Sequence, residues 1–365
     1  MNKAEFLIAG GGIAGLAAAI AVAPRETILL EQAREWSDVG AGLQLGPNAV
    51  RALQKLGAWD AVEPITSSPP EIHIHDGIGG KRLARWRLGA SFEKRFGAPY
   101  RVAHRADLHR ALLEVATALP NLKMRLGQAI TTCDQTEAAV SVTTEKSIFH
   151  AGKLFAADGV KSVTRQTLFA NSQPQTTGEI YHRALLTRND TVPNIAMECV
   201  NLWLYPNGHV VHYPVGKAQN LNLVAITPEQ QLPATFFEKS CPSLSGIIER
   251  PQTWTPWPSL YVEPLPQTCA NRILLLGDAA HGTVPYLAQG AAMALEDASQ
   301  LKTMPNDFTS ISAQRTARTR RLHNASMQQA RIYHATGFKK SALQFALLHL
   351  PEAIAWSRLA WLYKA

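Results

Sequence analysis

The sequence predicts a mixed α/β fold (α/β with α+β character), in which a parallel-sheet domain is interrupted by an inserted β-sheet domain and followed by C-terminal helices. Three observations predict it. A glycine-rich turn joins two apolar strand patterns at the start, a β-rich pattern fills residues 180–265, and "NRILLLGDAA" then returns to a buried strand before about 60 helical residues. A chain that leaves one pattern and re-enters it indicates a discontinuous domain, and ligands commonly bind between two such domains.

The first element is a strand, turn, helix and strand in succession. Residues 5–9 are the predicted first strand and residues 13–23 the helix, and "TILLE" is a second strand that ends in Glu31. The turn carries the G-x-G-x-x-G pattern of a Rossmann-like nucleotide site at Gly10, Gly12 and Gly15. The first glycine allows the tight turn, the second lets the backbone approach a pyrophosphate, and the third lets the helix pack on the strand. The helix N-terminus then faces the phosphates, and Glu31 would bind a ribose diol.

The remaining pattern divides the chain into three parts. Residues 1–71, 99–178 and 267–302 form the predicted nucleotide domain, residues 72–98 and 179–266 the inserted β-sheet domain, and residues 303–365 a helical segment. Within them we expect a helix from Pro47-Asn48, a hairpin at 71–86, a helix at 104–119, and strands at "AVSVTT", "KLFAADGV", "LWLYP", "HVVHYPV" and "LNLVAI".

Composition excludes several classes of protein. The four cysteines are far apart and have no ligand spacing with histidine, so we expect neither a metal site nor disulfides, and a reducing cytoplasm. The glycines break the apolar run 6–23, so we predict no integral membrane segment and no export signal there. The net charge is +8 and residues 308–351 lack acids, but no nucleic-acid motif accompanies the charge. We interpret the basic run as a solvated helix face; attraction of anionic ligands or a membrane surface are the alternatives.

Three fragments together carry a family resemblance. They are "GGGIAG" with the "LLE" that follows, "AADGVKSVTR" at 156–165, and "LLLGDAAHGTVPYLAQGAAMALEDA" at 274–298. This chain resembles the class A flavin-dependent aromatic monooxygenases of the p-hydroxybenzoate hydroxylase fold, in which the second fragment is an Asp-Gly motif and the third a Gly-Asp motif. "HRADLHRALL", "IYHATG" and "WLY" are similar to the salicylate, hydroxybenzoate and 6-hydroxynicotinate hydroxylase branch. The resemblance implies bound FAD, with NADH or NADPH as co-substrate.

The resemblance assigns the FAD contacts residue by residue. Glu31 and the adjacent Gln32 would bind the adenosine ribose, Asp278 the ribityl chain, and Arg105 the phosphates or the ribityl region. Small side chains would let the backbone touch the flat flavin ring, and the helix dipole would favour the anion of the reduced flavin. The further positions implied are Ala14 in the glycine turn, Ile130 near the adenine, Asp158 in the Asp-Gly motif, Pro285 beside the ring, and Gln289, Gly290 and Ala291 at a helix start. Glu296 and Asp297 follow on that helix as dipole partners, surface acids or direct participants.

The inserted sheet is expected to cover the substrate. His209 and Tyr213 stand four residues apart, which places both on one face of a strand and His212 on the other. The resemblance implies that His209 deprotonates or orients a substrate hydroxyl while Tyr213 bonds a carboxylate or hydroxyl; a structural histidine and tyrosine are the alternative. Gln44 and Tyr286 are candidate pocket residues. Arg183 either pairs with a substrate carboxylate or lies on the surface.

The implied reaction is hydroxylation of a small aromatic acid, phenolic or N-heteroaromatic, with O2 and through a C4a-hydroperoxyflavin. The alternatives are a larger or non-phenolic substrate such as an antibiotic, a polyketide or an alkene, or a flavin-binding protein without turnover. Disulfide reductases share the first motif but need a redox cysteine pair that this sequence lacks. The apolar, Trp-rich residues 342–365 suggest a dimer contact, a lipid-facing helix or a lid on the core, so both monomer and homodimer stay open.

Overall fold

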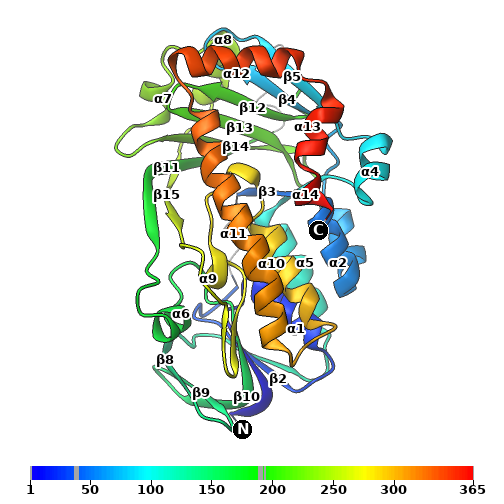
Figure 1. The fold of residues 1–365 in the computed structure, drawn as a ribbon, viewed down its shortest axis with the longest axis vertical. Helices are drawn as coiled ribbons and strands as arrows, with labels where there is room; N and C mark the ends of the chain where they lie inside the picture. The colour runs from blue at the N-terminus through cyan, green and yellow to red at the C-terminus, as the bar shows by residue number, and fades with distance from the viewer. Residues whose placement is uncertain (1, 37–40, 188–191, 193–194, 365) are drawn as a thin grey trace.

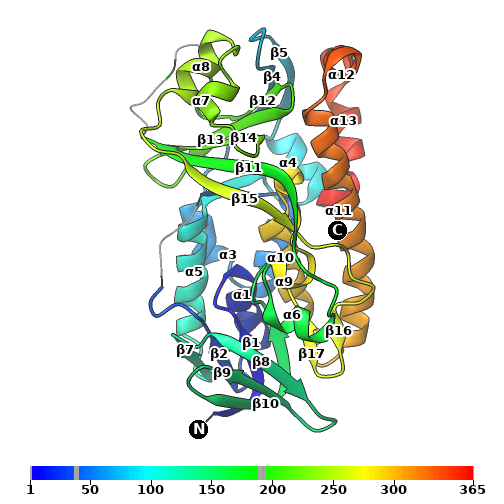
Figure 2. The ribbon, with the colours of Figure 1, turned by 90° about the vertical axis from the view of Figure 1, so that its left-hand side faces the viewer.

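The computed structural model describes residues 2–36, 41–187, 192 and 195–364. Two large sheets lie toward opposite ends of the molecule, and the long helix α11 (Phe308–Tyr333) extends from one toward the other (Figures 1 and 2). The predicted mixed α/β fold is confirmed, because one sheet is built around parallel strands, the other is mainly antiparallel, and helices end the chain.

Parallel strands form the centre of the first sheet, in the order β16-β17-β10-β1-β2-β7, with β9 and β8 added beside β10. The bounds are Lys3–Ala9 (β1), Thr27–Leu30 (β2), Leu122–Arg125 (β7), Ile130–Gln135 (β8), Val140–Thr144 (β9), Ile148–Ala156 (β10), Cys269–Ala270 (β16) and Ile273–Leu275 (β17). The apolar runs of β1 and β2 are buried, as strands covered on both faces require. In the register Ala9 pairs with Ala156 and Ala156 with Leu275. The three sequence motifs therefore begin side by side at one sheet edge.

Helices cover this sheet and bury its apolar face. The elements of the nucleotide domain are α1 (Ile13–Val22), α2 (Pro47–Leu56), α3 (Trp59–Val62), η1 (Glu63–Ile65), α5 (Arg105–Thr117), α6 (Val163–Leu168), α9 (Asp278–His281), η2 (Pro285–Leu287) and α10 (Gly290–Leu301). One apolar cluster joins α1, α2, α5 and α10 to Phe6 and Ile8 of β1. The glycine turn splits the apolar run 6–23 between β1 and α1, as predicted. Among the described residues, no helix has the length and apolar character needed to cross a bilayer.

The second sheet is mainly antiparallel, in the order β15-β11-β14-β13-β12-β4-β5. Its strands are Glu71–Asp76 (β4), Arg82–Arg87 (β5), Gln175–Leu186 (β11), Val200–Tyr205 (β12), Gly208–Val215 (β13), Asn220–Pro228 (β14) and Thr255–Tyr261 (β15). The hairpin predicted at 71–86 is present as β4 and β5. Helices α7 (Pro233–Phe236) and α8 (Pro242–Ile248) contribute to the apolar cluster that contains Val210 and Trp203. The predicted domain boundaries stay a prediction.

The C-terminal helices tie the two halves together. They are α11, α12 (Gly337–His349), α13 (Glu352–Arg358) and α14 (Ala360–Tyr363). Trp356 and Tyr363 pack edge-on against Phe92 and Phe96 of α4 (Ala90–Phe96), next to the two-stranded sheet of β3 (Gly42–Leu45) and β6 (Arg101–His104). The end of the chain is thus part of the core, whereas Phe345 of α12 is 66% exposed.

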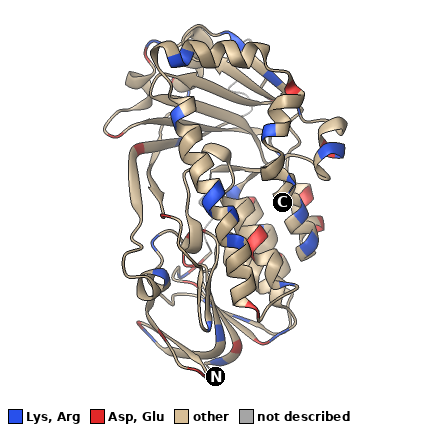
Figure 3. Cartoon of the chain, viewed as in Figure 1, with Lys and Arg blue, Asp and Glu red and all other residues tan. Residues whose placement is uncertain are grey.

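The interpretation of the basic run as a solvated helix face is wrong for Arg315. Basic side chains are distributed along α11 (Figure 3). Arg315 is buried, and its guanidinium bonds Glu296 and Asp297 at 2.6 Å each. Arg318 also reaches Glu296, at 2.5 Å. The alternative that Glu296 and Asp297 are surface acids is wrong for the same reason, since both are buried ion-pair partners of α11.

Candidate active site

The glycine turn has the geometry that its three glycines predict. Gly10 has φ +96°, and a Cβ there would lie 2.3 Å from Ala157 O. A Cβ at Gly15 would lie 1.9 Å from Gly10 O, so only glycine lets α1 pack here. A Cβ at Gly12 would meet no described atom within 4 Å, so the chain leaves open space above the helix start. Ala14 lies on the inner side, where a Cβ at Gly277 would come within 2.8 Å of it.

Replacing Gly15 by Ala should therefore lower stability, whereas replacing Gly12 by Ala should weaken FAD binding. Gly15→Ala forces a Cβ into the Gly10 carbonyl. We expect the free energy of unfolding to fall by at least about 1–3 kcal/mol. Gly12→Ala has room and an extended φ of −74°, so the fold should persist while FAD binds more weakly. Thermal melting and FAD fluorescence titration of both variants check this. Equal stability of the two would contradict it.

Glu31 closes the turn from the end of β2. Its Oε2 accepts the N–H of Gly11 at 2.6 Å and its Oε1 accepts that of Ala33 at 2.8 Å. The carboxylate thus stands at the glycine turn, as a ribose-binding acid must, while the adjacent Gln32 is exposed. Ile130 begins β8 two residues after Gln128, whose N–H donates to Glu31 O at 2.8 Å. Arg105 begins α5 and is exposed.

The Asp-Gly and Gly-Asp motifs are joined by a residue that sequence reasoning missed. The Asp158 carboxylate accepts the Ser162 hydroxyl at 2.5 Å and the Thr164 N–H at 3.1 Å, so it holds its own turn. Arg165 is fully buried and donates to Val160 O at 2.6 Å and Ala279 O at 3.0 Å. Its guanidinium therefore fixes the Asp158 turn to α9.

Asp278 is the exposed first residue of α9, shortly after the end of β17, and Asp297 supports the turn behind it. Asp297 Oδ2 accepts the Gly277 N–H at 2.8 Å and contacts His281 Nε2 at 2.6 Å, while Oδ1 accepts from Arg315. Burial raises the pKa of Asp297, but His281 and Arg315 outweigh this and bring the pKa to about 2. An ionised carboxylate in the core thus holds the Gly-Asp turn in place.

The segment Pro285–Ala291 turns into α10 as predicted. Ala288 has φ +52°, and Gln289 caps the helix. The Gln289 side chain is buried and accepts from Asn48 Nδ2 at 2.8 Å. Asn48 also donates to Glu296 at 2.7 Å, which secures the helix start to α2. A Cβ at Gly290 would meet no described atom within 4 Å. The turn at Gly12, the helix start at Gly290 and the exposed Asp278 leave the backbone open where FAD is expected, so these residues fit the cofactor.

Two groups of polar side chains lie along one face of the second sheet. In the first, His209 of β13 packs against Tyr286, Tyr333 and His334, with ring centroids 5.2–5.4 Å from its own. The Tyr286 hydroxyl donates to Glu179 Oε2 at 2.6 Å. Burial and the neighbouring His334 lower the pKa of His209 well below its usual value. The imidazole is therefore neutral, and one of its ring nitrogens carries a lone pair.

The second group surrounds Tyr213. A Cβ at Gly42 would lie 2.7 Å from its ring, and the Gly42 N–H donates to Asn222 Oδ1 at 2.6 Å. Burial raises the pKa of Tyr213, and Arg183 and Gln44 offset part of this. Gln44 accepts a short hydrogen bond from the Tyr100 hydroxyl. The structure thus brings Gln44 and Arg183 to Tyr213, and Tyr286 to His209.

Arg183 and Asn222 hold unused donors. Arg183 is half-buried, and its guanidinium lies 4.9 Å from the centre of the Trp257 ring. Its Nε and the Asn222 Nδ2 are buried and have no hydrogen-bond partner among the described residues. Unpaired buried donors are costly, so both are suited to an anionic ligand.

Comparison with known proteins shows the family to which the chain belongs. Residues 3–243 match the family described as FAD binding domain. A 3-hydroxybenzoate 6-hydroxylase of Polaromonas naphthalenivorans (strain CJ2) is 36% identical over 93% of this chain and 91% of its own length. A 6-hydroxynicotinate 3-monooxygenase of Bordetella bronchiseptica is 32% identical over 82% of this chain and 82% of its own. The chain belongs to the FAD-binding-domain family. It is an FAD-dependent aromatic monooxygenase.

Solved structures agree with the fold of the monooxygenase. Klebsiella pneumoniae HpxO complexed with FAD and uric acid superposes with a TM-score of 0.87 at 22% identity, covering 99% of this chain and 97% of its own. A salicylate hydroxylase substrate complex gives a TM-score of 0.81 at 22% identity, over 100% and 96% of the two chains.

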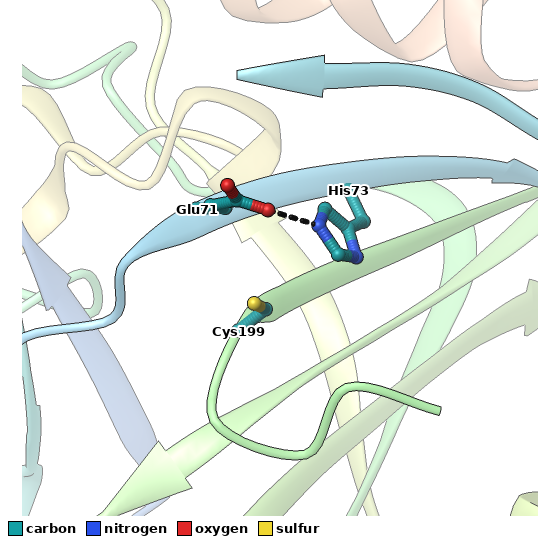
Figure 4. A group of neighbouring side chains, drawn as sticks. All are labelled: Glu71, His73 and Cys199. Carbon is teal, nitrogen blue, oxygen red and sulfur yellow. Dashed lines mark hydrogen bonds and ion pairs between the residues drawn. The ribbon is translucent and has the colours of Figure 1, made fainter. Parts of the chain in front are cut away.

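The monooxygenase also assembles a cluster that residue spacing did not reveal. Glu71, His73 and Cys199 place their possible ligand atoms within 4.8 Å of one another (Figure 4). Glu71 Oε2 lies 2.7 Å from His73 Nε2, but Arg85 bonds both carboxylate oxygens. The hydrogen bonds from Arg85 are the main cause that lowers the pKa of Glu71 to about 2, and they outweigh burial, which raises that pKa. Because the carboxylate is occupied, the cluster is a polar cross-link between β4, β5 and the start of β12.

Proposed function

We propose that this monooxygenase hydroxylates a small aromatic acid that carries a ring hydroxyl, using bound FAD, NADH or NADPH, and O2. One observation carries the proposal: a neutral histidine and two unused donors, Arg183 Nε and Asn222 Nδ2, lie on the same face of the second sheet. His209 and Tyr213 are separated by about 13 Å along β13 at the usual rise per residue. In our proposal a single ring with a hydroxyl and a carboxylate lies between them. The relatives named for 3-hydroxybenzoate and 6-hydroxynicotinate support the same substrate class.

Charge orients the substrate. Arg183 and the amide of Asn222 offer unpaired donors beside Tyr213, so the carboxylate binds at that end. His209 is buried and neutral, so the hydroxyl binds opposite and gives up its proton to the imidazole. Deprotonation makes the ring more electron-rich, which favours its attack on an electrophilic oxygen. Tyr286 lines the same end as His209, and Gln44 the end of Tyr213.

The cofactor supplies the oxygen chemistry, since bound FAD takes electrons from the nicotinamide and activates O2. The chain binds and orients it. In our proposal Glu31 and Gln32 bind the adenosine ribose, the N–H groups after Gly12 bind the pyrophosphate, and Asp278 binds the ribityl chain. The other proposed contacts are Gly10, Ala14, Gly15, Arg105, Ile130, Asp158, Pro285, Gln289, Gly290 and Ala291.

A substrate panel tests the proposed function. Purified protein loaded with FAD is supplied with NADH or NADPH and with salicylate, hydroxybenzoates, hydroxynicotinates and bulkier phenols. We expect one small hydroxy acid to stimulate coenzyme oxidation and to yield an equal amount of hydroxylated product. Product from bulky or non-phenolic compounds alone would overturn the aromatic-acid proposal, and bound FAD without any turnover would favour a flavin-binding role. Because the four cysteines are free, we propose that the protein is located in a reducing cytoplasm.

Replacing Arg183 tests the carboxylate end. Arg183→Met removes a charged donor, which is worth roughly 1.5–3 kcal/mol, so we expect KM for the acid to rise about 10- to 100-fold. The uncharged amide analogue of the same substrate should lose much less. Steady-state kinetics with both compounds give the comparison. A parallel loss for acid and amide would place the carboxylate elsewhere.

A further inference from the structure

A chain of polar contacts leads from His209 toward solvent. His209 Nδ1 lies 2.9 Å from His334 Nε2, and His334 Nδ1 lies 3.2 Å from Glu179 Oε1. His209 is buried, whereas the side chains of His334 and Glu179 keep 12% and 17% of their surface exposed. The three residues come from β13, the end of α11 and β11. Glu179 also accepts from Thr177 at 2.8 Å and from Tyr286.

The carboxylate fixes the direction of every hydrogen bond in this chain. Burial raises the pKa of Glu179, but hydrogen bonds from His334, Tyr286 and Thr177 bring the pKa below its ordinary value, so it is ionised. A carboxylate only accepts, and therefore His334 carries a proton on Nδ1. In the neutral form of the ring, which the relay uses, Nε2 of His334 is then the acceptor. His209 must then donate from Nδ1. Its Nε2 is left with a lone pair.

We propose that Glu179 and His334 are positioning residues that hold His209 in the Nδ1-protonated tautomer and carry the phenolic proton of the substrate toward solvent. This rests on the proposed function, because it needs a phenol beside His209 Nε2. The phenol O–H bond breaks as an Nε2–H bond forms on His209. The Nδ1 proton of His209 passes to Nε2 of His334. The Nδ1 proton of His334 passes to the Glu179 carboxylate, and from there to water.

Physical chemistry gives the transfer its outward direction. A proton added to His209 is unfavourable, because burial opposes a positive charge there. A positive charge on His334 is paired with the Glu179 carboxylate. The other titratable groups at this place are Tyr181, Tyr286 and Tyr333, and burial raises the pKa of each, so they stay neutral.

A tautomer measurement tests the inference without any substrate. Nitrogen NMR of the FAD-loaded protein with 15N-labelled histidine reads which ring nitrogen carries the proton. Loss of signals in His209→Gln and His334→Gln assigns the two rings. We expect Nδ1–H in both. His209 protonated on Nε2 would overturn the proposal, whatever the protein hydroxylates.

A chromophoric phenol tests the proton transfer itself. The absorbance of bound 3-hydroxy-4-nitrobenzoate reports ionisation of its hydroxyl. In Glu179→Gln and His334→Gln we expect the pH midpoint of that ionisation to rise by about one unit, and kcat to fall about tenfold or more with little change in KM. His323→Gln is the matched control, since His323 lies on the same helix and faces Glu263 at 3.9 Å; it should ionise the phenol as wild type does.

Unchanged ionisation in both variants would overturn the relay. Far-UV circular dichroism and FAD fluorescence show which variants fold, and either one that folds decides the matter. A wild-type protein that neither binds nor hydroxylates any hydroxybenzoate would overturn the proposed function instead, and the tautomer measurement would then decide the inference alone.

Discussion

Replacing Asp297 by Ala should lower the free energy of unfolding by about 3–5 kcal/mol and abolish FAD retention. The carboxylate is buried, accepts hydrogen bonds from the Gly277 N–H and from Arg315, and contacts His281 Nε2. Removing it leaves the buried Arg315 with Glu296 as its remaining carboxylate partner and the Gly277 N–H without an acceptor. The second loss matters for function, because Gly277 directly precedes Asp278. The turn that presents Asp278 should therefore loosen together with the core.

Chemical unfolding and cofactor retention measure this effect. Asp134→Ala is the control, since Asp134 is an exposed acid on β8, and its stability should stay near that of wild type. Asp297→Asn keeps the shape and one acceptor but removes the charge, so its stability should lie between that of wild type and that of Asp297→Ala. If Asp297→Ala melted like wild type and kept FAD, the buried ion pair would not support the turn.

Replacing His209 by Gln should reduce turnover by about 10²–10⁴-fold while FAD stays bound. The imidazole is buried and neutral, and by its place on β13 it faces Tyr286 and Tyr333. Glutamine can still hydrogen-bond a hydroxyl but cannot take its proton, so KM should change less than kcat. The loss should shrink for phenols that are already ionised at the assay pH, because these need no base.

His212→Gln provides the comparison on the same strand. His212 is equally buried but faces the other side of the sheet, where it bonds Trp203 Nε1 at 3.1 Å. Burial lowers its pKa to about 3, so it too is neutral. This variant should lose stability more than turnover per folded molecule. Similar kinetic losses in the two variants, after correction for folded FAD-bound protein, would mean that His209 acts only through packing.

Local sequence patterns predicted those features of the fold that depend on residues close together in the chain or on the adjoining strand. The glycine spacing gave the β1–α1 turn because each Cβ clash depends on a backbone a few residues away or on the adjoining strand. The four-residue spacing placed His209 and Tyr213 on one face because side chains alternate along a strand. Helix α10 began at Gly290 as expected, since small residues follow an irregular turn.

Long-range pairings could not be read in the same way. Asn48 is 241 residues from Gln289, and His209 is 125 residues from His334. Nothing in the acid-free run at 308–351 distinguishes Arg315, which is buried, from Arg320, which is exposed. The fragment "IYHATG" carries a family resemblance, but the contact of its histidine with Glu179 depends on the docking of α11 against the second sheet. Burial decided these roles, and burial follows from tertiary packing.

Oxygen-isotope labelling tests whether this protein inserts an atom of O2 into the aromatic ring. The FAD-loaded protein is supplied with NADH or NADPH, the best hydroxy acid of the panel and 18O2, and the product is analysed by mass spectrometry. We expect a new ring hydroxyl that contains one atom of 18O per molecule of product. Coenzyme oxidation that yields only hydrogen peroxide, or product whose new oxygen comes from water, would contradict it.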